Sequence, residues 1–123
     1  MSRRGFTLVE LLVVLGIVSL TSLFALPAWR LFSGQLLLDA AAKTIVSDLR
    51  RLQSQACLEQ RQIVFDPARL KLPRSLALSG HLAFGFSPSG FPPPGGSGTL
   101  ILSNQAGRQK KVVVSAAGRV RSE

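Results

Sequence analysis

The chain has 123 residues, enough for one small folded domain beside a membrane segment. Its formal charge is +9, from 15 Lys and Arg against 6 Asp and Glu. One cysteine and one histidine, Cys57 and His81, exclude an intramolecular disulfide and argue against a metal centre. Because no nucleophile, base and orienting group share a motif, we expect neither an enzyme nor a cofactor. The excess positive charge suits nucleic acid, an anionic surface or acidic partners, or serves solubility alone.

An apolar segment of membrane length follows a short basic leader that contains Arg3 and Arg4. No charged residue occurs from Leu11 to Trp29. A helix rises about 1.5 Å per residue, so this segment can cross a hydrocarbon core of about 30 Å. An acid at the edge of such a segment costs a few kcal/mol unless it has a partner. We therefore expect a membrane-spanning helix in which Glu10 has a specific role.

The residues Gly5-Phe6-Thr7-Leu8-Val9-Glu10 resemble the processing and assembly signal of type IV pilins and type II secretion pseudopilins. The resemblance implies that a prepilin peptidase/methyltransferase cuts after Gly5 and methylates the new amino terminus of Phe6. It implies assembly with other pilin or pseudopilin subunits through Glu10, whose carboxylate would neutralise the Phe6 amine in a low-dielectric site. Pro27 lies where many of these helices have a helix-loosening proline, and we expect a kink there.

Two other interpretations of this segment stay open. One is a secretory signal peptide, although the apolar run exceeds the usual length and lacks a small-x-small cleavage site. The other is a plain single-span anchor with Glu10 at the interface. Arg3 and Arg4 predict a cytoplasmic N-terminus by the positive-inside rule. The predicted organisation is a leader at 1–5, a membrane and assembly helix at 6–29, and an extracytoplasmic domain at 30–123. The expected location is the bacterial inner membrane, crossed once, and then a filament.

A second helical pattern predicts an amphipathic helix over about residues 36–60. Its apolar positions recur at three- and four-residue spacing, at Leu38, Ala41, Ala42, Ile45, Leu49, Leu52 and Ala56. Asp39 and Lys43 have the i, i+4 spacing of a weak surface ion pair. Cys57 lies in the same pattern and is predicted to be a buried free thiol, with intermolecular pairing as the open alternative.

After residue 61 the spacing of the apolar residues changes from the helical period of about 3.6 towards every second residue, which predicts strands. The expected strands cover residues 62–65, 76–78, 81–86, 99–102, 111–115 and 119–121. The segment 87–98 contains three consecutive prolines and paired glycines, and is predicted to be an exposed loop rather than a partner-binding Pro-rich motif. One long helix followed by short strands predicts an α+β fold with the helix packed on an antiparallel sheet. This layout agrees with the pilin fold that the N-terminal resemblance implies.

The ending Gly118-Arg119-Val120-Arg121 resembles GspH/FimT-type minor pilins, some of which use a Gly-Arg-x-Arg ending in DNA capture during natural transformation. Alternation in a strand would place Arg119 and Arg121 on one face, and guanidinium groups match phosphate oxygens. Three further basic residues lie nearby in sequence, at Arg108, Lys110 and Lys111. Together they predict a patch that binds the phosphate backbone without sequence preference. The alternative is that Arg119 and Arg121 contact neighbouring subunits or water.

The sequence is compatible with two functions. The first is a structural minor subunit of a type IV pilus, a competence filament or a secretion pseudopilus. The second is a subunit of such a filament that captures extracellular DNA. Both predict the peptidase, other subunits and the inner membrane as partners, and the second adds DNA.

Overall fold

The computed structural model describes residues 5–123; the leader arginines Arg3 and Arg4 lie outside the described residues. The chain forms two compact units, one that ends at Ser33 and one that covers Gly34–Glu123. We call the second unit the folded domain. Helix α1 (Leu8–Glu59) contributes to both units. The fold is α+β, as predicted, with the long helix followed by six short strands within the described residues.

Helix α1 continues through Pro27 and Gly34, so neither residue ends it. The loosening of the helix at Pro27 stays a prediction. The helix ends at Glu59, close to the predicted end, where Gln60 adopts a left-handed backbone with φ of 51°. Such a residue is a common helix terminator, and the Gln60 side-chain amide donates to the Cys57 carbonyl over 2.6 Å.

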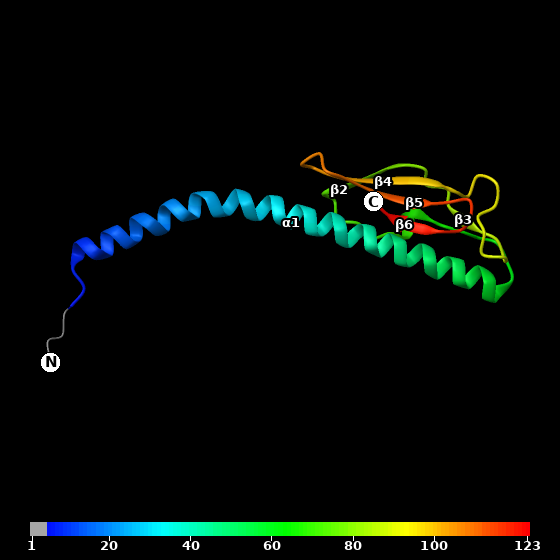
Figure 1. The fold of residues 1–123 in the computed structure, drawn as a ribbon, viewed down its shortest axis with the longest axis horizontal. Helices are drawn as coiled ribbons and strands as arrows, with labels where there is room; N and C mark the ends of the chain where they lie inside the picture. The colour runs from blue at the N-terminus through cyan, green and yellow to red at the C-terminus, as the bar shows by residue number, and fades with distance from the viewer. Residues whose placement is uncertain (1–4) are drawn as a thin grey trace. The chain divides into compact units, whose positions relative to one another are not determined.

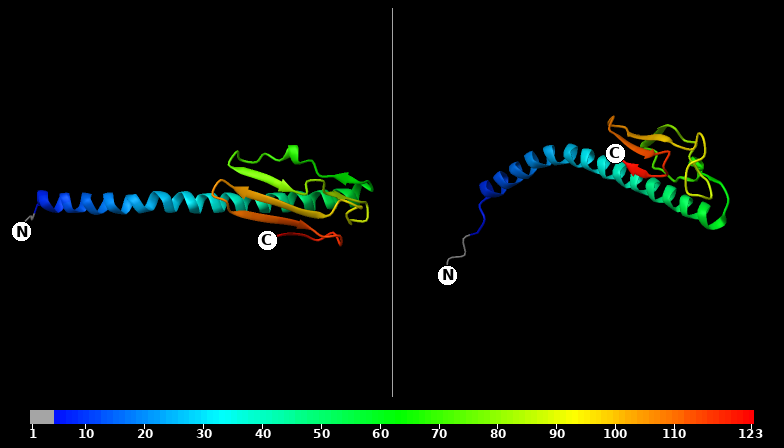
Figure 2. Two further views of the ribbon diagram at one scale, coloured as in Figure 1. Left: turned by 90° about the horizontal axis from the view of Figure 1, so that it is seen from above. Right: turned by 45° about the vertical axis from the view of Figure 1, so that its right-hand side comes forward.

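A four-stranded antiparallel sheet packs on α1 in the folded domain, as Figures 1 and 2 show. Its spatial order is β2 (Leu76–Gly80), β4 (Gly98–Asn104), β5 (Gln109–Val114) and β6 (Val120–Ser122). The predicted strands at 76–78 and 99–102 are both longer in the structure, where every residue of β2 pairs with a residue of β4. The four segments run alongside the helix in both views of Figure 2.

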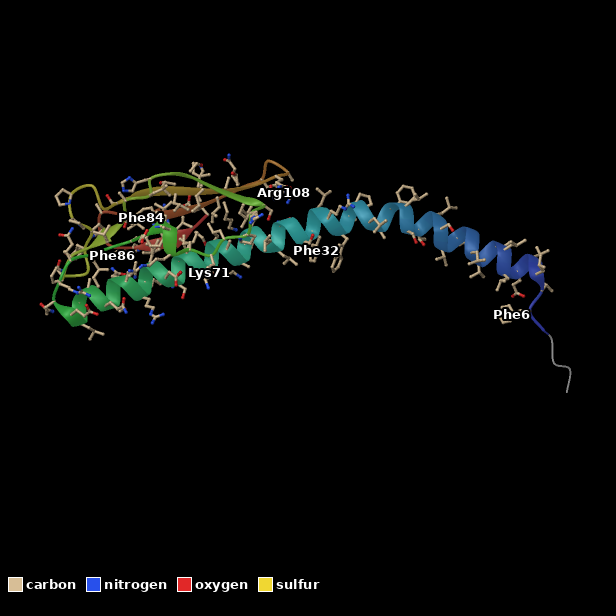
Figure 3. All side chains as sticks on the ribbon, turned by 180° about the vertical axis from the view of Figure 1, so that it is seen from behind. Phe6, Phe32, Lys71, Phe84, Phe86 and Arg108 are labelled. Carbon is tan, nitrogen blue, oxygen red and sulfur yellow. The ribbon has the colours of Figure 1, made fainter. Side chains whose placement is uncertain are left out.

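The register of the sheet places alternate residues against the helix. Leu100 pairs with Val112, and Val114 pairs with Val120, so these buried side chains share the inner face. They join the predicted helical stripe, in which Leu52 alone is only half-buried. Phe84 and Phe86 fill the remaining space between sheet and helix (Figure 3). Burial of this apolar surface is the main stabilising contribution to the domain.

Three short elements complete the domain. Strands β1 (Ile63–Val64) and β3 (Gly85–Phe86) pair with each other in a separate two-stranded sheet. The 3-10 helix η1 (Pro67–Arg69) was not predicted; Asp66 caps it by accepting the Ala68 N–H over 3.0 Å. The predicted strand at 81–86 forms only at its last two residues. Gly80 has a φ of 87° just before this segment, and that left-handed turn takes the chain out of the sheet.

Candidate functional site

The start of α1 is fixed by a side-chain cap. Gly5, Phe6 and Thr7 are exposed and precede the helix. The Thr7 hydroxyl accepts the Glu10 N–H over 3.2 Å, and the Thr7 carbonyl accepts the Leu11 N–H over 3.2 Å. Thr7 is therefore the N-cap, and the Gly5–Phe6 bond lies outside the helix. Glu10 sits in the first turn, where its negative charge is favoured by the helix dipole.

The first half of α1 presents apolar side chains that nothing in the described chain covers. By length and composition this helix can cross a membrane, and its most apolar stretch is wholly exposed. Ser19 and Ser22 donate their hydroxyls to carbonyls one turn earlier, at 2.7 Å each, and Thr21 does the same. Polar groups paired in this way within the helix are tolerated in hydrocarbon.

The predicted basic residues are not brought together in one patch. Arg119 and Arg121 are exposed on either side of the buried Val120, so they share the outer face of the sheet. Lys111 belongs to the same face, because the register pairs Val113 with Arg121. Glu123 is also there, and its carboxylate accepts from Arg121 over 2.9 Å.

Arg108 and Lys110 instead point towards α1, which corrects the prediction of a single patch with Arg119 and Arg121. Lys110 pairs with Leu102 and so lies on the inner face, where its ammonium contacts Asp39 over 3.0 Å. The predicted pair between Asp39 and Lys43 is replaced by this contact. The Arg108 guanidinium donates to Gln35 over 2.6 Å.

The turn before Arg119 is held by a residue that the sequence did not single out. The Gln53 amide donates to the carbonyl oxygens of Gly90 and Gly118, over 2.7 and 2.9 Å. Gly118 has a φ of 77°, and a Cβ there would lie 2.8 Å from the Gly90 oxygen. The glycine of the Gly-Arg-Val-Arg ending is therefore required by the fold itself. On the same side, Arg50 donates to the Val120 carbonyl over 3.2 Å.

Comparisons with known proteins agree with this N-terminal geometry. Residues 1–26 match the family described as the prokaryotic N-terminal methylation motif. The chain is also 29% identical, over 159 aligned positions that cover the whole of both chains, to the pilin-like protein PilA1 of Thermus thermophilus. No solved structure gives a significant match. The methylation motif and the pilin-like relative together support a likeness to type IV pilins.

The likeness to pilins bears on several expectations. Pilin family proteins are structural subunits and not enzymes. The N-terminal motif implies processing by a prepilin peptidase and assembly with other pilins. The apolar half of α1 is typical of a pilin membrane anchor, which supports a location in the inner membrane and then in a filament. The fold agrees as well, since a long N-terminal helix packs on antiparallel sheets.

Cys57 and His81, the other residues with reactive or metal-binding side chains, have structural surroundings. Cys57 is a free thiol that is half-buried rather than buried, because it lines a shallow groove beside Gly90 and Phe91. His81 stacks edge-to-face on Phe84, with ring centres 5.1 Å apart, and its Nε2 lies 3.1 Å from the Ala83 oxygen. Within residues 5–123, no three His, Cys, Asp or Glu side chains gather into a metal-binding group.

Proposed function

We propose that this chain is a pilin, and that it is a minor, GspH/FimT-type structural subunit of a type IV pilus, competence filament or secretion pseudopilus. The observation that carries the proposal is the Thr7 cap, which leaves the Gly5–Phe6 bond in exposed, non-helical backbone ahead of an uncovered apolar helix. A peptidase needs an accessible, unfolded bond, and a subunit needs an apolar helix free to pack in a filament. The short strands after residue 61 and the Gly-Arg-Val-Arg ending support the minor-pilin type.

The proposed topology places residues 1–5 in a cytoplasmic leader and 6–29 across the inner membrane. Residues 30–123 then form the extracytoplasmic part. Cleavage after Gly5 would free the Phe6 amine close to Glu10, one helical turn away. We infer that this carboxylate pairs with a Phe6 amine of a neighbouring subunit, since an unpaired charge in hydrocarbon is costly. Pairing between copies would set the axial register of the helices.

Cleavage is tested by the mass of the mature chain from cells that hold the peptidase. Gly5→Val should abolish removal of the leader. Gly16→Val is the matched control, because a Cβ added at either glycine would have no atom within 4 Å, and it should be processed normally. An unchanged mature mass for Gly5→Val would refute processing at this bond.

Assembly is tested separately with Glu10→Val. This variant should lose its leader normally and remain in the membrane, yet be missing from sheared filaments. Glu59→Val, which removes an exposed carboxylate at the other end of α1, is the control and should assemble. Normal incorporation of Glu10→Val would refute the proposed charge pair.

A second candidate function is capture of extracellular DNA. Arg119 and Arg121 are exposed on the same outer face of the sheet as Lys111. This arrangement of two guanidinium groups beside an ammonium group favours DNA capture. Phosphate groups would have to compete with Glu123 for Arg121. Because Arg108 and Lys110 are engaged with α1, we expect a weaker and smaller DNA site than five clustered cations would give.

DNA binding is tested on the full chain in neutral detergent, titrated with labelled duplex across a range of salt. Arg119→Ala/Arg121→Ala should weaken binding and flatten its salt dependence, with a slope change of about 1–2 in log Kd against log salt. Lys71→Ala/Arg74→Ala removes the same charge from the other end of the domain and should bind nearly as the parent does. Equal losses in both double variants would indicate nonspecific attraction and leave only the structural role.

A further inference from the structure

Several cations lie towards the end of the folded domain where the chain enters at Gly34; we call this the proximal end. Arg108 lies there, because it donates to Gln35 and because Asn104 of its hairpin approaches Gly34. Figure 3 shows Arg108 at the tip of the β4–β5 hairpin, above α1. Arg74 precedes β2, whose first residue pairs with Asn104. Arg74 therefore occupies the same end of the sheet.

Lys71 lies on the segment between η1 and β2. It lines a groove of about 360 Å³ with Leu37, Ala40 and Thr44 of α1. These helical residues are within about three turns of Gly34. We call Lys71, Arg74 and Arg108 the proximal basic surface. All three side chains are exposed.

The proximal basic surface is not neutralised by the acids of the domain. None of its three cations forms an ion pair with a carboxylate of residues 5–123. Asp39, the acid nearest Gly34 in α1, is engaged by Lys110. Asp48 lines the same groove as Lys71, and it is more than two turns further along the helix than Asp39. The surface thus keeps a net positive charge at the proximal end.

The covalent chain keeps this end close to the apolar segment. Arg30 follows the last uncharged residue, Trp29, and Gly34 comes only four residues after Arg30. Even fully extended, this step from Trp29 to Gly34 spans at most about 18 Å. The chain itself therefore keeps the proximal end near the headgroups of a membrane that the apolar segment spans.

We propose that the proximal basic surface binds the anionic phospholipid headgroups of the membrane in which the subunit is stored. This inference rests on the proposed membrane insertion, and it adds a partner that the assembly role does not need. The lipid bilayer is favoured over a soluble polyanion because the chain itself holds the surface near the headgroups. The contact restrains the folded domain against the bilayer until the subunit leaves the membrane for a filament.

The test uses the full chain in vesicles, with Cys57→Ser and one new cysteine that carries a fluorophore. Ala106→Cys reports on the proximal end and Ala117→Cys on the opposite end, and both positions are exposed. Headgroup-attached nitroxide lipids act as the quencher. Vesicles contain either phosphatidylcholine alone or phosphatidylcholine mixed with phosphatidylglycerol. Resistance of the chain to alkaline extraction measures insertion independently.

The lipid contact predicts that quenching at residue 106 rises about twofold when phosphatidylglycerol is present, and that high salt removes the rise. Residue 117 should show no such rise. Lys71→Gln/Arg74→Gln should lose most of the effect while leaving the Arg108–Gln35 bond intact. Arg119→Gln/Arg121→Gln removes the same amount of charge from the outer face of the sheet, and this variant should retain the rise in quenching at residue 106.

Two results would overturn different proposals. An inserted chain whose quenching at residue 106 is the same in both lipids, or is unaffected by Lys71→Gln/Arg74→Gln, overturns the lipid contact alone. A chain that alkaline extraction removes from the vesicles overturns the membrane insertion on which the proposed function depends. Loss of the phosphatidylglycerol effect on addition of DNA would instead assign the surface to a soluble polyanion.

Discussion

The side-chain amide of Gln53 donates a hydrogen bond to the Gly118 carbonyl oxygen over 2.9 Å. The same nitrogen also donates to the Gly90 carbonyl, so one helical side chain joins the proline-rich loop and the β5–β6 turn. The turn leads directly into the exposed Arg119. Gln53 thus determines where the Gly-Arg-Val-Arg ending leaves the body of the domain.

Replacing Gln53 should destabilise the domain without changing any exposed charge. Gln53→Leu keeps the side-chain size but leaves two carbonyl oxygens without their donor, at a cost of about 1–3 kcal/mol. Thermal unfolding of the full chain in detergent, followed by circular dichroism, measures the change. Gln105→Leu, in the exposed β4–β5 turn, should stay within about 0.5 kcal/mol of the parent. Equal stability of both variants would mean that water replaces the Gln53 contacts.

Gly118→Ala should be more destabilising than Gly107→Ala, although both glycines have positive φ, 77° and 79°. The left-handed backbone costs about 1–2 kcal/mol in either variant. Only at residue 118 does the added Cβ also meet a main-chain oxygen, at 2.8 Å, whereas residue 107 has open space. The difference between their unfolding free energies measures the steric part. A matching loss in both would show that the turn at 118 can shift away from Gly90.

Leu49→Ala tests the packing of the helix on the sheet. Leu49 is 0% exposed in the core cluster, and its truncation should cost about 2–5 kcal/mol in unfolding free energy. Leu58→Ala provides the control on the same helix, because Leu58 is 82% exposed and its loss should be nearly neutral. Chemical denaturation of both variants gives the comparison, and a large cost at Leu58 would reveal a contact in solution that buries it.

The ion pair between Lys110 and Asp39 should contribute little to stability. Their side chains are 33% and 37% exposed, so solvent screens the attraction, and a double-mutant cycle with Asp39→Asn and Lys110→Gln should give about 0.5 kcal/mol of coupling. The coupling should fall further at high salt. Zero coupling at low salt would show that the 3.0 Å contact is not maintained in solution.

Thr7→Val should loosen the first turn of α1, because valine keeps the shape of threonine but cannot accept the Glu10 N–H. The loss of an N-cap costs about 0.5–2 kcal/mol. Amide exchange at Glu10, measured by NMR in micelles, should accelerate by about one order of magnitude. Thr7→Ser retains the acceptor and should exchange like the parent. Unchanged exchange in Thr7→Val would exclude the cap as the determinant of the helix start.

Local patterns in the sequence were sufficient for the fold class and for most elements. The apolar stripe from Leu38 to Ala56 is periodic over many residues, and 112–114 is a run of three β-branched valines; both lie in the predicted elements. The short η1 helix and the early end of the predicted strand at 81–86 depend on single residues, Asp66 and Gly80. Such local geometry produces no repeating pattern that periodicity could detect.

The basic site was harder to predict because sequence proximity does not fix the face on which a side chain lies. Lys110 and Lys111 are adjacent, yet the register of β5 sends Lys110 to Asp39 and Lys111 to the outer face. The role of Gln53 depends on partners 37 and 65 residues away, which no local motif contains. Gly5, Phe6, Glu10 and Pro27 remain predictions for processing, assembly and helix loosening.

The separation between the two charged ends of the sheet has a consequence for how the sequence can evolve. Gln35, beside Arg108, and Gln53, beside the Gly118 turn, are 18 helical residues apart, or about 27 Å. Substitutions at that distance usually act additively. Each end can therefore acquire, alter or lose a ligand under its own selection, while the sheet and α1 between them keep the same packing.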